Sequence, residues 1–143
     1  EEKLHVLLQF INSQYKERGI IFCRTKKATQ HLAKQLIAKN ISTDAIHGDL
    51  YQKERDKVLR AFKKEKLQLI VATDIAARGL DIDALSYVVH YQLPESEEYY
   101  THRSGRTARA GNSGLSMAFV TAFESNKLRA YEKSLDISFE RVR

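Results

Sequence analysis

The sequence predicts an α/β domain built on an open, mostly parallel sheet with helices on both faces. Short continuous runs of apolar residues, which are typical of strands buried on both faces of a parallel sheet, alternate with amphipathic segments of helical period. The chain has 143 residues, 43% of them hydrophobic and 29% charged, which is ordinary for a globular protein with one core. We therefore expect a single domain over residues 1–143, with ligands collecting at the carboxyl ends of its strands.

The first part of the chain contains two pairs of a helix and a strand. Apolar residues spaced i, i+3, i+4 and i+7 predict a helix over residues 3–15. The continuous apolar run over residues 19–23 predicts a buried strand. Thr25 is suited to cap a second helix, which ends near Asn40, and a short strand is expected over residues 43–46.

The rest of the chain continues the alternation of helices and strands. In order, we expect a helix with Val58, Leu59 and Phe62 turned inward, a strand over 67–72, a helical turn over 75–78 that Gly79 closes, a strand over 87–91, a helix over 95–100, a strand over 115–120 and a helix over 125–135.

Charge and cysteine content narrow the function classes. The formal net charge of +6 and the isoelectric point near 9.4 favour an acidic partner such as nucleic acid or a nucleotide phosphate. The single cysteine, Cys23, cannot form an internal disulfide, and no Cys and His spacing is that of a metal site, so a reducing, cytoplasmic environment and no metal are expected. The sequence has no secretion signal and no apolar run that could span a bilayer, so no membrane partner is expected.

The stretch from His102 to Gly111 carries an arginine at every third position, namely Arg103, Arg106 and Arg109. A step of three residues keeps successive side chains of a helix on roughly one side, so the three charges would converge. The planar guanidinium fork suits phosphate oxygens, and the small residues between the arginines allow close approach. The alternative interpretation is a solvated basic turn, although such turns usually mix in Lys and Glu.

Four stretches of the sequence carry a resemblance when they are taken together: residues 21–26, residues 47–49 with Gln52 and Arg55, residues 72–81, and residues 102–111. In this order they resemble motif IV, the Gln-x-x-Arg motif, motif V and motif VI of the DEAD-box RNA helicases, in the second of their two RecA-like domains. The resemblance covers nearly the whole chain, and the last two motifs are specific in order and spacing. Family members most often carry Ile in place of Ser104 and often Asn in place of Arg24.

The resemblance implies a role for several residues in ATP hydrolysis. Arg106 and Arg109 match arginine fingers, which stabilise the transferred phosphate when a second domain closes. Asp81 matches a carboxylate that binds the ribose of ATP, and Gly79 lets the backbone approach the nucleotide. Three further residues match family positions that couple the two domains, namely Arg78, His102 and Arg103. For His102 and Arg103, a local salt bridge is an equally weighted alternative.

For RNA, the resemblance implies contacts to the backbone of single-stranded or duplex RNA without sequence preference. The main candidates are Gly48, Arg55 and Thr73, and Thr73 can also cap a helix. Arg24, Thr25 and Gln52 are weaker candidates. Few aromatic residues lie in these loops, so base stacking should contribute little.

The sequence contains no phosphate loop and no Asp-Glu-Ala-Asp stretch, so it corresponds to half of a helicase. The resemblance implies that ATP with Mg²⁺ binds mainly to an N-terminal RecA-like domain in cis, and that the chain alone is inactive. One alternative is a stand-alone RNA-binding or adaptor module on the same fold. Another is an unrelated doubly wound nucleotide-binding enzyme, which is disfavoured because residues 24–27 replace the glycine-rich loop expected after the first strand. The target RNA and the source organism stay open.

Overall fold

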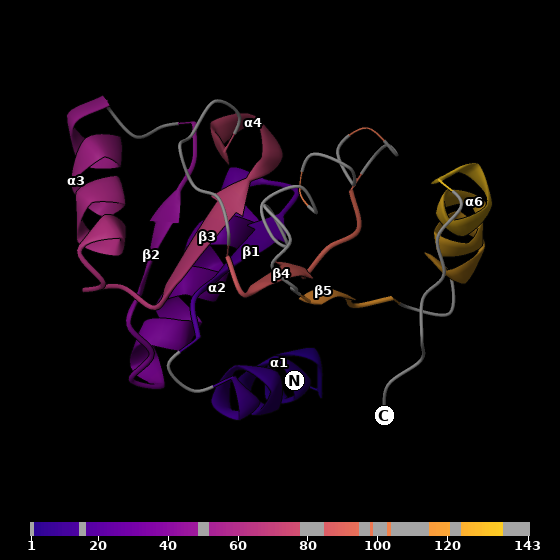
Figure 1. Cartoon of the computed structure of the whole chain (residues 1–143), viewed down its shortest axis with the longest axis horizontal. Coiled ribbons are helices and arrows are strands. Elements are labelled where there is room, and N and C mark those ends of the chain that lie inside the picture. Colours follow the sequence, from indigo (N-terminus) through magenta and orange to yellow (C-terminus); the bar gives the residue numbers. More distant parts are fainter. Residues whose placement is uncertain are drawn as a thin grey trace.

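The computed structural model describes residues 2–14, 17–48, 52–77, 85–94, 98, 103, 115–120 and 124–135. Within these residues, five parallel strands form one open sheet in the order β2-β3-β1-β4-β5 (Figure 1). The strands are β1 (Gly19–Cys23), β2 (Thr43–Ile46), β3 (Leu69–Thr73), β4 (Tyr87–His90) and β5 (Leu115–Ala118). The helices are α1 (Glu2–Ser13), α2 (Lys26–Ala38), α3 (Gln52–Lys63), α4 (Asp74–Ala77) and α6 (Ser125–Leu135). The predicted fold class is confirmed, and every described strand pair is parallel.

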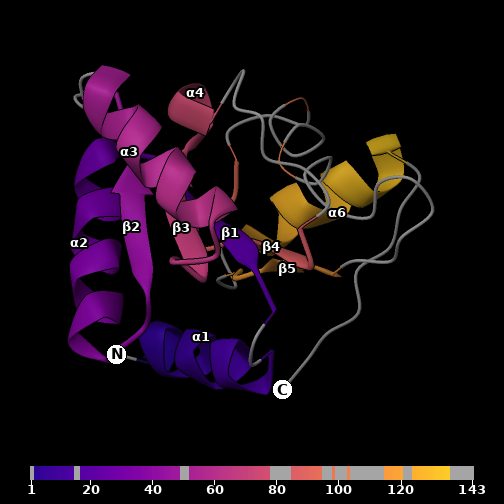
Figure 2. The same ribbon diagram turned by 60° about the vertical axis from the view of Figure 1, so that its left-hand side comes forward.

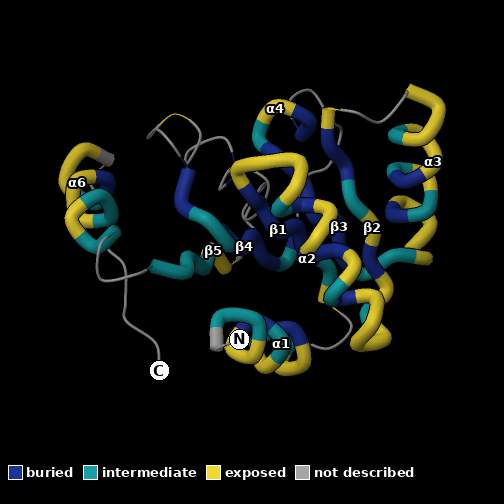
Figure 3. Tube along the Cα trace, turned by 180° about the vertical axis from the view of Figure 1, so that it is seen from behind, coloured by how far each residue is buried: buried dark blue, intermediate teal, exposed yellow. Residues whose placement is uncertain are grey.

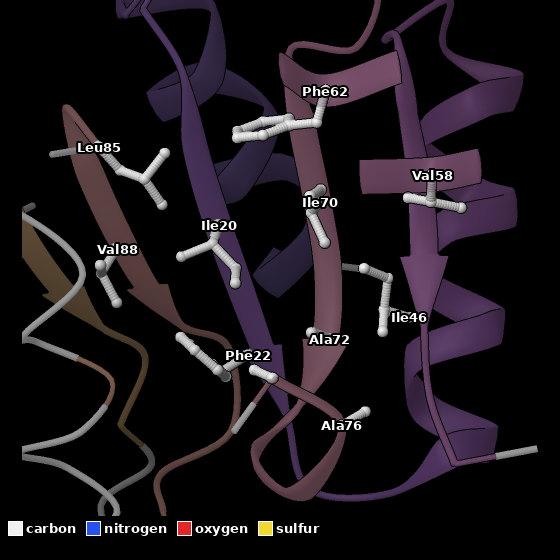
Figure 4. Packing of buried hydrophobic residues seen from close by; sticks show 11 residues of the cluster. Ile20, Phe22, Ile46, Val58, Phe62, Ile70, Ala72, Ala76, Leu85 and Val88 are labelled. Atoms are coloured by element: carbon white, nitrogen blue, oxygen red, sulfur yellow. The ribbon is translucent and has the colours of Figure 1, made fainter. Parts of the chain in front are cut away.

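Alternation along the strands divides the core into two layers. In β1, Ile20 and Phe22 face a cluster that includes residues of α3 and α4, whereas Ile21 and Cys23 face a cluster that includes residues of α1 and α2. Figure 4 shows the first cluster between the strands and α3, and Figure 2 shows α2 and α3 with β2 between them. Helices therefore cover both faces of the sheet, as the apolar runs predicted.

Most element boundaries agree with the sequence prediction within two residues. The strand expected over 67–72 instead spans Leu69–Thr73, because Gln68 N still donates to Ser42 O at 2.8 Å, outside the ladder. The first helix ends at Ser13, two residues earlier than expected. Of the helix expected over 95–100, only Glu98 lies among the described residues.

Both ends of α2 follow from local chemistry. Thr25 is its N-cap, since Thr25 Oγ1 accepts a hydrogen bond from Ala28 N at 3.1 Å, as predicted. At the other end, Asn40 adopts a left-handed φ of 64°, which Asn tolerates better than most residues. Ile41 N then donates to Leu36 O at 3.1 Å, which ends the helix.

The carboxyl ends of β1, β2 and β3 lie at one edge of the sheet, beside α4 (Figures 1 and 2). The register pairs Cys23 with Thr73 and Ile46 with Ala72. The residues that follow these strands are therefore neighbours, and we call this the carboxyl edge. None of the helices in the described part of the chain is both long and apolar enough to cross a membrane.

Candidate functional site

Arg103 is buried at the carboxyl edge, with only 1% of the residue exposed. Its Nε lies 2.6 Å from Asp74 Oδ1 and its Nη2 lies 2.7 Å from Asp74 Oδ2, which is a bidentate ion pair. Arg103 Nη1 donates to Gln92 O at 2.8 Å, and the guanidinium lies over the Phe22 ring, 5.0 Å from its centroid. Partners from α4, from β1 and from the chain after β4 thus compensate for the loss of solvation of this charge.

His90, at the end of β4, extends this cluster toward β5. Its Nδ1 lies 3.4 Å from Arg103 Nη1, and its Nε2 lies 2.9 Å from Ser116 Oγ. Burial, followed by the charge of Arg103, lowers the pKa of His90 to about 3, so the imidazole is neutral near pH 7. Because a guanidinium can only donate, Nδ1 is the accepting nitrogen and Nε2 carries the proton toward Ser116.

Arg24 connects the end of β1 to the chain after β4. Arg24 N donates to Gln92 Oε1 at 2.7 Å, and Arg24 Nε donates to Leu93 O at 2.6 Å. Its Nη2 lies 3.7 Å from Glu124 Oε2, just before α6. Tyr131 Oη, from α6, donates to Pro94 O at 2.8 Å. The polar groups at the ends of β1 and β4 are therefore bonded to one another within the domain.

The ends of β2 and β3 are arranged differently. Thr73 Oγ1 accepts a hydrogen bond from Ala76 N at 3.3 Å and so caps α4, as predicted. Gly48 is exposed, and a Cβ built at this glycine would meet no atom within 4 Å. The backbone of Gly48 is also outside the left-handed region, so neither φ nor packing against the described residues requires a glycine there.

Arg55 reaches from the first turn of α3 to α4. Its Nη2 donates to Ala76 O at 3.0 Å. Its Nε is buried and has no hydrogen-bond partner within the described residues. One turn away, Gln52 Nε2 donates to Asp56 Oδ1 at 2.9 Å. The Arg55 guanidinium is therefore held in place by one bond while part of its donor capacity is unused.

Sequence and structure comparisons identify the family. The helicase conserved C-terminal domain matches residues 2–111. The chain belongs to the DEAD-box helicases. It is 40% identical over 142 residues to the DEAD-box ATP-dependent RNA helicase CshA of Bacillus cereus, covering 99% of this chain and 27% of that protein.

Two solved structures place the similarity in the C-terminal domain of this family. The C-terminal domain of the DEAD-box protein Dbp5 is 34% identical to this chain, with a TM-score of 0.90. The similarity covers 99% of this chain and 83% of the Dbp5 domain. Dbp5 of S. cerevisiae, bound to RNA and ADP BeF3, is also 34% identical with a TM-score of 0.90, over 98% of this chain and 38% of that one. The chain spans about a quarter of the length of the curated relatives it matches, as for CshA at 27%.

In this DEAD-box domain, the candidates for RNA contact fall into two groups. Thr25, Gly48 and Thr73 lie at the carboxyl edge, and Arg55 joins them through α4. Arg24 follows β1 at the same edge, but its guanidinium faces Leu93 and Glu124. The amide of Gln52, in the first turn of α3, bonds along its own helix to Asp56.

Arg103 forms the local salt bridge that the sequence left open as an alternative. A side chain that is 1% exposed has no surface for direct contact with another domain, so any coupling through Arg103 must pass through Asp74 or its other partners. The other candidates for nucleotide binding and domain coupling lie outside the described residues, and their roles stay predictions: Arg78, Gly79, Asp81, His102, Arg106 and Arg109.

Sequence reasoning missed three members of the buried cluster. Asp74 lies within motif V, residues 72–81, and its signal is that a carboxylate after a buried strand is a natural partner for a buried arginine. His90 lies in the strand expected over residues 87–91. Its presence as a titratable residue inside a fully buried strand is the signal that could have indicated a polar cluster. Gln92 carries no such signal, because Arg103 binds its backbone oxygen.

Two further observations concern reactive groups. In the described part of the chain, no three or more His, Cys, Asp or Glu residues are grouped so that they could hold a metal ion. Burial raises the pKa of the Cys23 thiol to about 12, so this cysteine stays protonated and is a poor nucleophile in the folded domain.

Proposed function

We propose that this chain is the C-terminal motor domain of an intracellular, ATP-dependent RNA helicase, and that it binds RNA phosphates at the β2-β3-β1 part of the carboxyl edge. The observation that carries the proposal is Gly48. A glycine with open space around it, beside a helix cap and a held arginine, suits the close approach of a ligand's backbone. In this proposal the domain works with a second, ATP-binding domain in cis.

The RNA contacts are to the backbone. Thr25 uses a lone pair of its hydroxyl for Ala28 N, which leaves the hydroxyl hydrogen for a phosphate oxygen. Arg55 supplies a positive charge, which its bond to Ala76 O holds beside α4, the helix that Thr73 caps. Because phosphates and sugars carry no base identity, binding should be independent of sequence. The Dbp5 relative that binds RNA supports this assignment.

The contribution to ATP hydrolysis rests on the family resemblance. Arg106 and Arg109 act as fingers on the transferred phosphate, while Gly79 and Asp81 contact the nucleotide, and Mg²⁺ is held mainly by the other domain. Arg78 and His102 couple the domains directly. Arg103 contributes through Asp74, which follows the RNA candidate Thr73.

Gly48→Val tests the RNA surface, because no atom of the described residues lies within 4 Å of a Cβ built there. We expect the parent chain to bind labelled single-stranded RNA with a Kd on the order of 10⁻⁴ M at physiological salt and a log–log salt slope of about −2. Fluorescence anisotropy should show poly(U) and poly(A) competing equally and Gly48→Val binding on the order of 10-fold more weakly at an unchanged Tm. Tight, salt-insensitive binding of one RNA, unaffected by Gly48→Val, would instead favour the adaptor module.

Joining the chain to a DEAD-box N-terminal domain tests the enzymatic part. Arg106→Ala and Arg109→Ala should each lower kcat by on the order of 10³-fold with less effect on ATP binding, as for arginine fingers in general. Asp81→Ala should mainly raise KM for ATP. ATP turnover by the 143-residue chain alone, abolished by Arg109→Ala, would contradict the division of labour between two domains.

A further inference from the structure

The outward side of α3 carries a row of basic side chains that none of the motifs includes. Lys53, Lys57, Arg60 and Lys64 follow one another at i, i+4, i+7 and i+11, with Lys64 directly after the last helical residue. At 100° per residue, these four positions fall within about 60° of one another on the helix. All four are exposed, on the side opposite the buried Val58 and Phe62. We call this row the α3 basic stripe.

The α3 basic stripe is not neutralised within the domain. In the described part of the chain, none of its four members makes an ion pair or a side-chain hydrogen bond. The neighbouring acid Asp56 accepts a bond from Gln52 instead. Residues 52–66 contain seven basic and three acidic side chains, and this excess of four accounts for most of the chain's net charge of +6. The positive charge of the chain is thus concentrated on α3 and the three residues after it.

The arrangement is unfavourable for an isolated helix. Like charges three or four residues apart repel each other, and the stripe contains three such neighbouring pairs. Lys53 lies in the first turn, where the helix dipole disfavours a cation. The outer side of α2, which covers the other face of the sheet, instead mixes Lys34 with Gln30 and Ile37. Solubility of the domain does not require four basic side chains in one row. A bound polyanion, in contrast, would offset the repulsion between them.

The stripe begins where the proposed RNA surface ends. Arg55, in the first turn of α3, touches the carboxyl edge through its bond to Ala76 O. From Lys53 to Lys64 the helix then runs about 16 Å toward the opposite edge, at 1.5 Å per residue. Figure 1 shows α3 beside β2, and Figure 3 shows its outer side as exposed. Phosphates that leave Arg55 can therefore continue along the outer side of α3, where the four stripe residues are basic and exposed.

We propose that the α3 basic stripe is an additional phosphate-binding track for the RNA strand that leaves the carboxyl edge. The inference rests on the proposed RNA function and deepens it, because it assigns part of the affinity to residues outside the family motifs. RNA is the proposed ligand of the stripe, because the basic side chains of α3 begin beside the proposed RNA surface and complement the charge of phosphates.

Charge removal on two helices tests the track. Lys57→Gln/Arg60→Gln removes two charges from the stripe, and Lys34→Gln/Arg129→Gln removes the same two residue types from exposed positions of α2 and α6. Anisotropy is measured over a salt series centred on about 0.1 M with two RNAs: a short one that fills only the carboxyl edge, and one that extends about 16 Å further. For the longer RNA, the stripe variant should bind on the order of 10-fold more weakly, with a salt slope shallower by about 1.4.

The short RNA and the control variant make the result specific. The short RNA should bind both double variants almost alike, and Lys34→Gln/Arg129→Gln should change either affinity by less than about 2-fold, since surface charges act over about 10 Å in 0.1 M salt. Equal losses in the two double variants would overturn the track, because they would show only a net-charge effect. Amide chemical shifts of the 143-residue chain provide a second measurement, and the longer RNA should shift residues of α3 as well as Gly48.

Gly48→Val separates this inference from the function on which it rests. If Gly48→Val weakens RNA binding while the stripe variant does not, the track is wrong and the RNA surface stands. If neither variant changes binding, or the chain binds no RNA at low salt, both are wrong. If poly-glutamate shifts the α3 amides and the longer RNA does not, the stripe belongs to an acidic polypeptide and the RNA assignment is overturned.

Discussion

The carboxyl edge of the sheet has two halves that use their polar groups in opposite ways. Where β1 and β4 end, Arg103 and Arg24 find their partners within the domain, and the partner of Arg103 is Asp74, directly after β3. Where β2 and β3 end, Gly48 is exposed and Arg55 keeps a buried Nε without a hydrogen-bond partner in the described residues. We call these the closed half and the open half.

The comparison distinguishes polar groups that stabilise the fold from polar groups that are open to a ligand. A buried charge is tolerated only when its donors are matched, so the closed half is explained by the domain itself. The open half is not, because among the described residues no atom packs against a Cβ built at Gly48 and the Nε of Arg55 has no hydrogen-bond partner. The same sheet edge therefore supplies both the support and the surface for a ligand.

The largest expected effect lies in the closed half. Arg103→Ala leaves the Asp74 carboxylate without its bidentate partner and should lower the free energy of unfolding by about 3–5 kcal/mol, as for other broken buried ion pairs. Arg55→Ala, in the open half, should cost less than about 1.5 kcal/mol, because it loses one hydrogen bond. Urea denaturation of the 143-residue chain measures both.

Arg103→Lys provides a second test of the closed half if Arg103→Ala does not fold. Lysine keeps the charge but loses the planar fork that binds both oxygens of Asp74 and Gln92 O, so it should still be clearly destabilised. Equal stability losses for Arg103→Ala and Arg55→Ala would show that the two halves do not differ as described.

The second effect is a loss of stability in acid, caused by His90. Its pKa is lowered from 6.5 to about 3 in the folded chain, so only the unfolded chain binds a proton between these values. This contribution to stability is complete above about pH 6.5 and is lost as the pH falls toward 3. At 1.36 kcal/mol per pKa unit, His90 should lower stability by about 2 kcal/mol between pH 7 and pH 5.

Urea denaturation at several pH values measures this dependence. His90→Asn should make the pH dependence shallower over this range, whatever its effect at pH 7. His31→Asn is the matched control, since His31 is exposed on α2, and it should leave the dependence unchanged. A parent chain with constant stability from pH 7 to pH 5 would mean that His90 is accessible to protons in the folded state.

The third prediction compares one arginine from each half for RNA binding. Arg55→Ala should weaken binding to every RNA by about 5-fold in 0.1 M salt and flatten the log–log salt slope by about 0.7, the effect of one phosphate contact on a single strand. Arg24→Ala should change RNA affinity less, because its guanidinium is engaged by Leu93 O and Glu124. Anisotropy over a salt series would contradict the comparison if Arg24→Ala had the larger effect.

The fold was largely predictable because its signals are local. The apolar run at 19–23 and the short strand expected over 43–46 have the observed bounds, and Thr25 marks the start of α2 as predicted. The strand order β2-β3-β1-β4-β5 was not predicted, because it depends on pairing between distant segments. The start of β3 was misplaced because Leu67 is apolar and packs against the core without joining the ladder.

The site was predictable only in part, for the same reason. Residues next to strand ends could be placed at one edge from topology alone, which located Thr25, Gly48 and Thr73. Whether an arginine turns inward or outward depends on the partners that the fold provides. Sequence therefore left the role of Arg103 open between coupling and a salt bridge, and gave no sign that His90 would lie beside it.

The smallest predicted effect separates two roles of Thr25, which lies just after β1 and caps α2. Its Oγ1 accepts the hydrogen bond from Ala28 N at 3.1 Å, whereas its hydroxyl hydrogen is free to donate to a phosphate. Thr25→Ala removes both functions, so it should cost about 0.5–1 kcal/mol of stability and also weaken RNA binding. Thr25→Ser keeps both and is the control. Urea denaturation and anisotropy give the two measurements.

Thr25→Asp is the variant that divides the two roles. An aspartate keeps a capping oxygen for Ala28 N and adds a negative charge that the N-terminus of α2 favours, so stability should be kept or slightly raised. The same carboxylate has no hydrogen to donate and repels phosphate, so RNA should bind at least as weakly as it does to Thr25→Ala. A stable Thr25→Asp domain that binds RNA like the parent chain would leave Thr25 as a cap alone. The RNA path would then shift from α2 toward Gly48 and α3.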